Sequence, residues 1–476
     1  MDGKYKRLGI NTILVFIGKL GSGLITFLML PLYTRWLGPD QFGLADLINT
    51  YSNILVSLVT CSMADAIFIF PKTADENGQC KYYSSGLLVA IIGILLSVII
   101  ANILRNNCFS DLGTIHTNSI QIVILSSCLF LQSYTQQFTR SIDKMKVYSI
   151  SGIVLSAAIA VFAFLLIPLF GADGYIYSLA LANITASLYS FFASGSLKYL
   201  SLRFFDKTFA IDLLKYGVPL IPNSIMWWLV DGINRPIMEV KLGLSAIGIY
   251  AVASKFPSVL NVISGAFSNA WGISVSEEYG KDNFNEYFNE IFKLIFFILM
   301  VLSMIISIFS DVIISLFASS EYAEASSILP VLLLGVIFSN SSALFGGIFM
   351  ARKQSKFYFY SSIWGSVASL LSLLLFIGLF GIYGVALSTV VSICVMSIAR
   401  AFYVWRDINQ INIIYYLLSI ILYLIFLLIH FLLGGVPRNA FLALLLFIYL
   451  LINKQIVFKF LAVLKKTSLV SDKNQR

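Results

Sequence analysis

Long apolar segments separated by short polar loops are the feature that most restricts how this chain can fold. The 476 residues are 59% hydrophobic and only 12% charged, a balance that soluble domains do not show. About 20 apolar residues cross a bilayer core, and backbone in lipid must satisfy its own hydrogen bonds, so each segment is predicted to be a helix. We therefore expect an all-α polytopic membrane protein with about 14 transmembrane helices, at residues 10–33, 44–68, 83–104, 119–139, 149–170, 174–196, 216–236, 246–272, 291–317, 327–350, 358–380, 383–403, 412–433 and 438–458.

The second half of the chain repeats motifs of the first half in the same order. A Pro-x5-Leu-Gly-x4-Gly motif that starts at Pro31 recurs from Pro236, an offset of 205 residues. Two further motifs recur at an offset of 210: Lys-x-Tyr-x2-Ser from Lys146 and Lys356, and Leu-Phe-Gly-x2-Gly-x3-Ser from Leu169 and Leu379. Such a repeat predicts two pseudo-symmetric six-helix lobes around a central cavity. The expected units are an N-terminal lobe (1–198), a cytoplasmic linker (199–215), a C-terminal lobe (216–407), and two extra helices with a basic tail (408–476).

The distribution of basic residues predicts the orientation of the chain. With the N-terminus inside, segments on the inside hold 25 of the 32 Lys and Arg residues, and the outside loops hold five. This is the bias of the positive-inside rule, and it places both termini in the cytoplasm of a multi-pass inner-membrane protein. The net charge of +9 is thereby explained without a nucleic-acid partner. Five scattered cysteines and two isolated histidines predict no disulfide framework, no metal site and no cofactor.

Polar residues inside the predicted spans are candidates for a substrate cavity. Lys19 and Lys255 lie in the middle of apolar spans, where an uncompensated lysine is costly, and a water-filled cavity explains them better than snorkelling. Two fixed positive charges would favour an anionic headgroup such as a phosphate or diphosphate. Amides and a tryptophan on neighbouring spans suit sugars, although packing between helices remains an alternative. These further candidates are Asn49, Asn53, Asn223, Trp227 and Asn261.

Other residues are candidates for gating and for ion coupling. Glycines and a proline in the first span and prolines around the seventh can break helices, as the moving parts of transporters require. These are Gly21, Gly23 and Pro31 in the first span and Pro219, Pro222 and Pro236 around the seventh. Asp65 and Asp231 are the acids expected at membrane depth, where either could bind a driving proton or sodium ion. An alternative for Asp231 is a structural pair with Arg235, one helical turn later.

Two of these segments resemble a known family. The run from Pro31 to Gly43, PLYTRWLGPDQFG, is similar to the signature PLYTRxLGPxxFG of bacterial polysaccharide-repeat-unit flippases, and the segment from Gly248 to Lys255 is similar to their eighth helix. These flippases are part of the multidrug/oligosaccharidyl-lipid/polysaccharide exporter superfamily. The resemblance implies two six-helix lobes around a cavity that opens alternately to each side. The implied substrate is an undecaprenyl-diphosphate-linked oligosaccharide, flipped across the inner membrane for O-antigen, capsule or exopolysaccharide synthesis, with a polysaccharide polymerase and a chain-length regulator as expected partners.

The same resemblance suggests roles for individual residues. Lipid II flippases of the superfamily use cationic side chains near helices 1 and 8, a role that Lys19 and Lys255 could fill here. Some relatives bind sodium with acids on helices 7 and 11. Asp231 is available on the seventh span here, but the eleventh span, 358–380, contains no acid, so a sodium site of this type lacks its second ligand.

Two other functions compete with a flippase. A multidrug/cation antiporter of the same superfamily is disfavoured by the lysines, which would repel a cationic drug. A membrane O-antigen polymerase or glycosyltransferase, an enzyme, is expected to carry a long outside loop with catalytic charges. The longest hydrophilic stretches here run to about 20 residues, so a non-enzymatic transporter is favoured.

Overall fold

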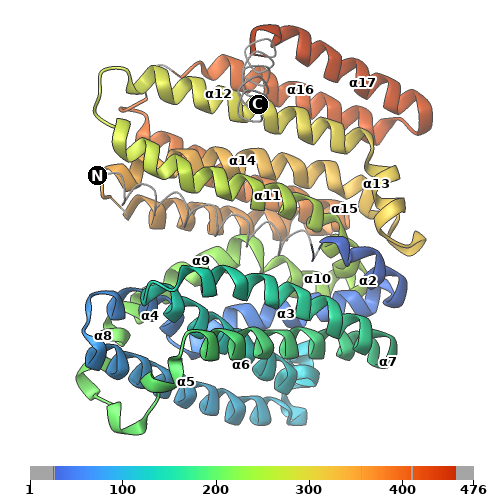
Figure 1. The fold of residues 1–476 in the computed structure, drawn as a ribbon. Helices are drawn as coiled ribbons and strands as arrows, with labels where there is room; N and C mark the ends of the chain where they lie inside the picture. Colours follow the sequence, from blue (N-terminus) through green and yellow to red (C-terminus); the bar gives the residue numbers. More distant parts are fainter. Residues whose placement is uncertain (1–24, 26, 355, 409–410, 457–476) are drawn as a thin grey trace, which may run out of the picture.

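The computed structural model describes residues 25, 27–354, 356–408 and 411–456, whose regular structure is entirely helical (Figure 1). Short 3-10 helices join several of the α-helices. The α-helices are α2 (Leu30–Trp36), α3 (Pro39–Val59), α4 (Met63–Ile69), α5 (Glu76–Leu104), α6 (Thr114–Ser141), α7 (Met145–Ala193), α8 (Lys207–Gly217), α9 (Ile221–Asp231), α10 (Asn234–Leu242), α11 (Leu244–Glu278), α12 (Phe284–Ile308), α13 (Ser310–Phe317), α14 (Ala325–Ala351), α15 (Lys356–Val404), α16 (Ile413–Leu432) and α17 (Gly435–Ile452).

Nine helices within the described ranges are long and apolar enough to cross a membrane, so the chain is a multi-pass membrane protein. The sequence predicts more spans because it divides the chain differently. Two of the nine helices, α7 and α15, are 49 residues long and each covers two predicted spans. The predicted seventh span is broken into α9 and α10, and most of the first lies outside the described residues. The total of 14 therefore stays a prediction.

Each 49-residue helix is a hairpin that reverses at a repeated glycine. Gly171 in α7 and Gly381 in α15 have φ of 57° and 55°, a backbone region that suits glycine. Three residues later, a Cβ atom on Gly174 would lie 2.2 Å from the carbonyl oxygen of Leu166, so the returning helix packs directly on the outgoing one. Gly384 packs against Phe376 in the same way, at 2.1 Å. The repeated Leu-Phe-Gly-x2-Gly motif thus has one structural role in both copies.

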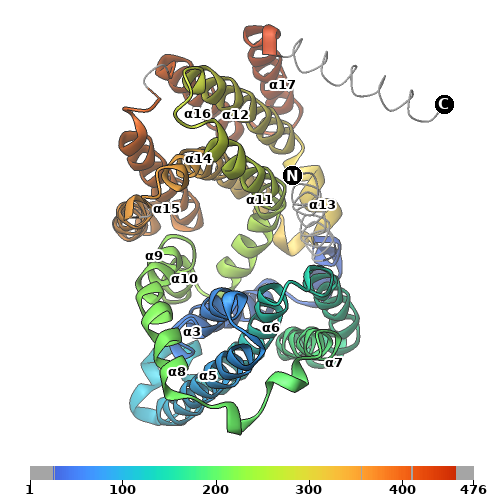
Figure 2. The same ribbon diagram turned by 60° about the vertical axis from the view of Figure 1, so that its left-hand side comes forward.

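The helices form two groups that lie side by side. Figures 1 and 2 show α3 to α8 on one side and α11 to α17 on the other, with α9 and α10 between them. The linker helix α8 packs on the first group, since Leu213 is fully buried there and Lys81 of α5 pairs with Asp206 at 3.0 Å. Asp206 also caps α8, accepting a hydrogen bond from the backbone N–H of Thr208, and these donors lower the pKa of its carboxyl group. The predicted domain boundaries stay a prediction.

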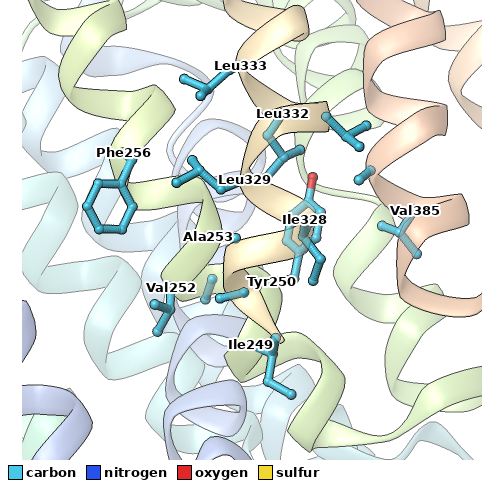
Figure 3. Packing of buried hydrophobic residues seen from close by; sticks show 14 of the residues in the cluster. Ile249, Tyr250, Val252, Ala253, Phe256, Ile328, Leu329, Leu332, Leu333 and Val385 are labelled. Atoms are coloured by element: carbon cyan, nitrogen blue, oxygen red, sulfur yellow. The ribbon is translucent and has the colours of Figure 1, made fainter. Parts of the chain in front are cut away.

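The second group is organised around α14. This helix is apolar on all sides, and 89% of its most apolar 18-residue window is buried, as expected for a helix surrounded by others. Figure 3 shows Ile328, Leu329 and Leu332 of α14 between Tyr250 and Ala253 of α11 and the α15 helix. The packing fixes α11, which carries Gly248, the last residue of the second copy of the first repeated motif.

Candidate functional site

The two copies of the Leu-Gly-x4-Gly motif pack against each other. A Cβ atom on Gly43 of α3 would lie 2.0 Å from the carbonyl oxygen of Leu244, and one on Gly248 of α11 would lie 2.0 Å from that of Pro39. Pro39 and Leu244 are themselves equivalent at the offset of 205 residues, so the contact is reciprocal. Only glycine lets two helix backbones approach so closely. We call this crossing of α3 and α11 at Gly43 and Gly248 the glycine seal.

Further contacts between the N-terminal half and the C-terminal half of the chain lie at the same end as the glycine seal. The hydroxyl of Tyr322 donates to the carbonyl oxygen of Leu37 at 3.0 Å. Glu239 of α10 accepts hydrogen bonds from the backbone N–H and the hydroxyl of Thr114, at 2.7 and 2.6 Å, and thereby caps α6 across the junction. The end of the bundle that the sequence predicts to face outward is therefore closed by backbone and side-chain contacts.

A buried polar network reinforces the glycine seal. Arg235 Nε lies 3.3 Å from a carboxylate oxygen of Asp46, and both side chains are largely buried, at 13% and 14% exposed. The guanidinium also lies over the ring of Tyr250, 5.2 Å from its centroid. Asn234 and Tyr250 hydrogen-bond to each other at 3.2 Å, and Tyr250 to Thr389 of α15 at 3.0 Å. A structural pair with Arg235 is the predicted alternative role of Asp231. In the structure Arg235 donates a hydrogen bond to the backbone carbonyl oxygen of Asp231, and its ion pair is with Asp46 of the other half of the chain.

Beyond the glycine seal, polar candidates on α3 and α11 become accessible. Asn53 is exposed and donates to the backbone oxygen of Asn49 at 2.8 Å, so the two amides form a continuous polar strip on α3. On α11, Lys255 is half-buried and Asn261 is exposed. Within the described part of the chain Lys255 belongs to no ion pair. No carboxylate of the described residues therefore neutralises its charge.

The candidates on the seventh span lie on a broken helix. Asn223 and Trp227 are on the 11-residue helix α9, and the Trp227 ring is 43% exposed. Pro222 stands in the first turn of α9, where its missing N–H is not needed, and Pro219 lies in the 3-10 turn before it. The helix ends at Asp231, whose side chain is exposed.

The remaining candidates are spread over other places. Pro31 and Pro236 stand in the first turns of α2 and α10, while Asp65 is exposed in the first turn of α4. Lys19, Gly21 and Gly23 lie outside the described residues. The structure thus does not bring every candidate into one cluster. Of the helices that carry the charge and amide candidates, α3 contacts both α9 and α11.

The sequence interpretation overlooked one deeply buried charge. Arg400, near the end of the predicted span 383–403, is not among the candidates that the sequence suggests, yet it lies within α15 and is only 3% exposed. Its Nε donates to the hydroxyl of Ser361 at 3.0 Å, and a terminal nitrogen donates to the backbone oxygen of Ser342 at 3.1 Å. The offset of 210 aligns Arg400 with Ser190, a difference between the copies that could have revealed it.

Comparison with known families supplies independent findings. A family model described as polysaccharide biosynthesis protein matches residues 8–273, more than half of the chain. A second model, described as MatE, matches residues 236–375.

Individual relatives and solved structures agree with these matches. The Lsg locus putative protein 1 of Haemophilus influenzae is 24% identical over 270 residues, which cover 55% of this chain and 64% of that relative, less than two thirds of its length. The structure of the lipid II flippase MurJ in an inward closed conformation is 16% identical and covers 95% of this chain and 99% of that one, with a TM-score of 0.72. The structure of an inward-facing multidrug resistance MATE family transporter of the MOP superfamily is also 16% identical. It covers 85% of this chain and 97% of that one, with a TM-score of 0.66. At this identity the two structures share the fold.

Proposed function

The chain belongs to the polysaccharide biosynthesis protein family, and from this membership we propose that it is a flippase for an undecaprenyl-diphosphate-linked oligosaccharide. The substrate would be moved from the cytoplasmic to the outer leaflet of a bacterial inner membrane by alternating access. The repeat unit so delivered would serve O-antigen, capsule or exopolysaccharide synthesis. A polymerase and a chain-length regulator on the outer side are the partners that such a product requires.

The observation that carries the proposal is the glycine seal. Two equivalent segments of the repeat meet at one end of the lobe junction through the reciprocal contact of Gly43 and Gly248. In the proposed cycle the two lobes separate at this contact. Away from the seal, Asn53 and Asn261 are exposed on the same two helices. A junction that is closed at one end and polar beyond it is expected for one of the two states of an alternating-access transporter. In the other state the glycine seal would be open.

The substrate class is supported by charge and by hydrogen-bonding capacity. Lys255 has no carboxylate partner within the described ranges, and Lys19 is its proposed companion from the first span. Lysines act as point charges toward a diphosphate. The amides of Asn49, Asn53, Asn223 and Asn261 suit sugar hydroxyls, and the exposed ring of Trp227 suits the apolar face of a sugar.

Transport in the outward direction needs a source of free energy. Asp231 and Asp65 are the proposed ion-coupling residues, for a proton or for sodium. Asp231 is on the broken seventh span, where a change of its charge would act directly on α9. The proline and glycine positions around this span and the first are the proposed hinges.

A cation antiporter is the second candidate, favoured by the match of residues 236–375 to the MatE model. The unneutralised Lys255 argues against a cationic substrate. An O-antigen polymerase or glycosyltransferase is the candidate from a different class.

Deletion of the gene distinguishes the three functions. A flippase mutant accumulates undecaprenyl-diphosphate-linked repeat units that an enzyme added outside spheroplasts cannot modify. A polymerase mutant leaves single repeat units accessible from outside, and a glycosyltransferase mutant leaves them incomplete. Loss of an antiporter changes drug sensitivity without any accumulation of repeat units. Any result other than inaccessible, complete repeat units contradicts the flippase proposal.

A further inference from the structure

Arg400 is a buried cation that has no carboxylate partner among the residues that the structure describes. Its three hydrogen-bond acceptors are neutral: Ser361 Oγ, the Ser342 carbonyl oxygen and, at 3.7 Å, the sulfur of Met396. The guanidinium carbon lies 4.7 Å from the ring centroid of Tyr358 and 5.9 Å from that of Trp227. Aromatic faces attract a cation only weakly compared with an ionised acid. Within the described part of the chain, no ionised acid pairs with the positive charge of this site.

Three other arginines of the described chain that have little exposed surface do have such partners. Arg235 pairs with Asp46, Arg352 with Asp407 and Arg438 with Asp311. Of these three residues, Arg438 is 8% exposed and Arg235 and Arg352 are only partly buried, so all three are less buried than Arg400, which is 3% exposed. Buried charges in proteins are as a rule paired, because removing an ion from water is costly. The most buried of these arginines is thus the one without a carboxylate.

The internal repeat shows that the fold does not need an arginine here. At the offset of 210, Arg400 and Ser361 correspond to Ser190 and Ser151 of α7. In that copy the hydroxyl of Ser190 donates to Ser151 at 2.8 Å, in place of the bond from the guanidinium to Ser361. The same hairpin contact is therefore made by two serines in one lobe. A structural role alone does not explain the additional charge.

Arg400 is covered by a helix with the features of a moving part. Trp227, which lies over the guanidinium, is on α9, and α9 contacts α15 through a hydrogen bond from Ser366 to the Met226 carbonyl at 2.8 Å. The helix has only 11 residues and is separated from α10 by Gly232 and Ile233. Displacement of α9 from α15 would expose the guanidinium toward the lobe junction.

We propose that Arg400 is an anion-binding group for the diphosphate of the lipid-linked substrate, covered by Trp227 in the sealed state and uncovered when α9 moves. This site rests on the proposed function and adds to it an assigned residue in the C-terminal lobe. A guanidinium presents paired N–H donors that match phosphate oxygens, which a lysine does not. The lysines of the junction would attract the headgroup, and Arg400 would fix its orientation.

Binding of three probes to purified, full-length protein tests the site. The probes are farnesyl diphosphate, farnesol and inorganic diphosphate, which separate the prenyl chain from the anion. Arg400→Met and Arg400→Ser should bind farnesyl diphosphate about 10- to 100-fold more weakly, the range for loss of a charge-assisted hydrogen bond. Arg400→Lys should bind farnesyl diphosphate with an affinity between those of wild type and Arg400→Met. Trp227→Ala should bind it several-fold more tightly than wild type, because the ring that covers the guanidinium is removed. Arg406→Met, which removes an exposed arginine six residues later, should bind as wild type does.

The outcomes separate this site from the function on which it rests. Equal affinity of wild type and Arg400→Ser for farnesyl diphosphate, at equal melting temperature, overturns the site and leaves the flippase proposal standing. Failure of the wild-type protein to bind farnesyl diphosphate overturns both. If wild type binds inorganic diphosphate and farnesyl diphosphate with equal affinity, the claim that the site binds the diphosphate of a lipid is overturned. Since two serines hold the equivalent contact in the other lobe, Arg400→Ser is expected to fold even if Arg400→Met does not.

Discussion

Replacement of Gly43 by alanine is the sharpest perturbation of the glycine seal. The new methyl group would lie 2.0 Å from the Leu244 carbonyl oxygen and 2.9 Å from the Gly248 backbone nitrogen. Ordinary contact begins at 3.4 Å, so α3 and α11 must separate by about 1.4 Å, the difference between 3.4 and 2.0 Å. Both obstructing atoms belong to helix backbones, so no side-chain rotation relieves the clash.

The expected effect follows from the cost of overpacking. Inserting a methyl group into a tightly packed contact costs about 1–3 kcal/mol. Because the clash exists only while the seal is closed, this cost shifts the equilibrium toward the open state by about 5- to 150-fold, at about 1.4 kcal/mol per tenfold. Gly248→Ala should act alike, through the Pro39 carbonyl oxygen at 2.0 Å. The free-energy change in the double variant should be smaller than the sum of the changes in the two single variants, because one separation of α3 and α11 relieves both clashes.

Distance measurements between spin labels report the state of the seal. Gln41 on α3 and Lys241 on α10 are exposed and lie on opposite sides of the junction at this end, so labelled cysteines fit there once the five native cysteines are replaced by serine. The wild-type protein should give mainly the short distance of the sealed state. Gly43→Ala should raise a longer-distance population.

Two matched glycines control for general damage. Gly93 of α5 makes an equally tight contact inside one lobe, 2.0 Å from the Val59 carbonyl oxygen, so Gly93→Ala should lower the melting temperature without changing the distance distribution. Gly265 has open space around it, so Gly265→Ala should change neither the melting temperature nor the distance distribution. An unchanged distance distribution in Gly43→Ala, in a protein that folds normally, would refute the seal as a gate.

Three further predictions address the charged residues of the junction. Asp46→Asn leaves the charge of Arg235 without its carboxylate partner, which costs about 3 kcal/mol for a largely buried pair, so the same spin labels should report opening of the glycine seal. Combining Asp46→Asn with Arg235→Gln should reverse part of that opening. An unchanged distance distribution in the Asp46→Asn variant would contradict the account. Lys255→Ala should lower transport about tenfold, and combination with Lys19→Ala should abolish surface polysaccharide at normal protein levels, whereas normal polysaccharide would exclude both lysines from substrate binding. Asp231→Asn should remove the stimulation of transport by a proton or sodium gradient, and undiminished stimulation would end its role in coupling.

Much of the fold was predictable because its signals are local or periodic. Apolar segment length predicts helices in a membrane protein, and the repeated motifs predict equivalent lobes. The hairpins at Gly171 and Gly381 show why the spacing recurs, since each motif places a reversal and a close helix contact at fixed positions. The first motif recurs for a related reason, because Gly43 and Gly248 meet in one reciprocal contact.

The partners of the buried charges were not predictable in the same way. Asp231 is the natural helical neighbour of Arg235, yet the ion pair joins Arg235 to Asp46, 189 residues away in the sequence. Such a pair depends on how two helices from different lobes are rotated toward each other, which periodicity within one helix does not determine. Arg400 stands near the end of an apolar span, where a basic residue normally marks a cytoplasmic loop. Its burial depends on the neighbouring helices α9 and α14.

Transport by purified protein in liposomes tests the central claim most directly. Vesicles are loaded with a labelled undecaprenyl-diphosphate oligosaccharide, and an enzyme that modifies only the sugars of the outer leaflet measures translocation. The account predicts that wild-type protein makes the inner-leaflet pool accessible, that Lys255→Ala does so more slowly, and that an oligosaccharide on a neutral lipid is not moved. Translocation no faster than in protein-free vesicles, under an imposed proton or sodium gradient of either direction, would contradict it.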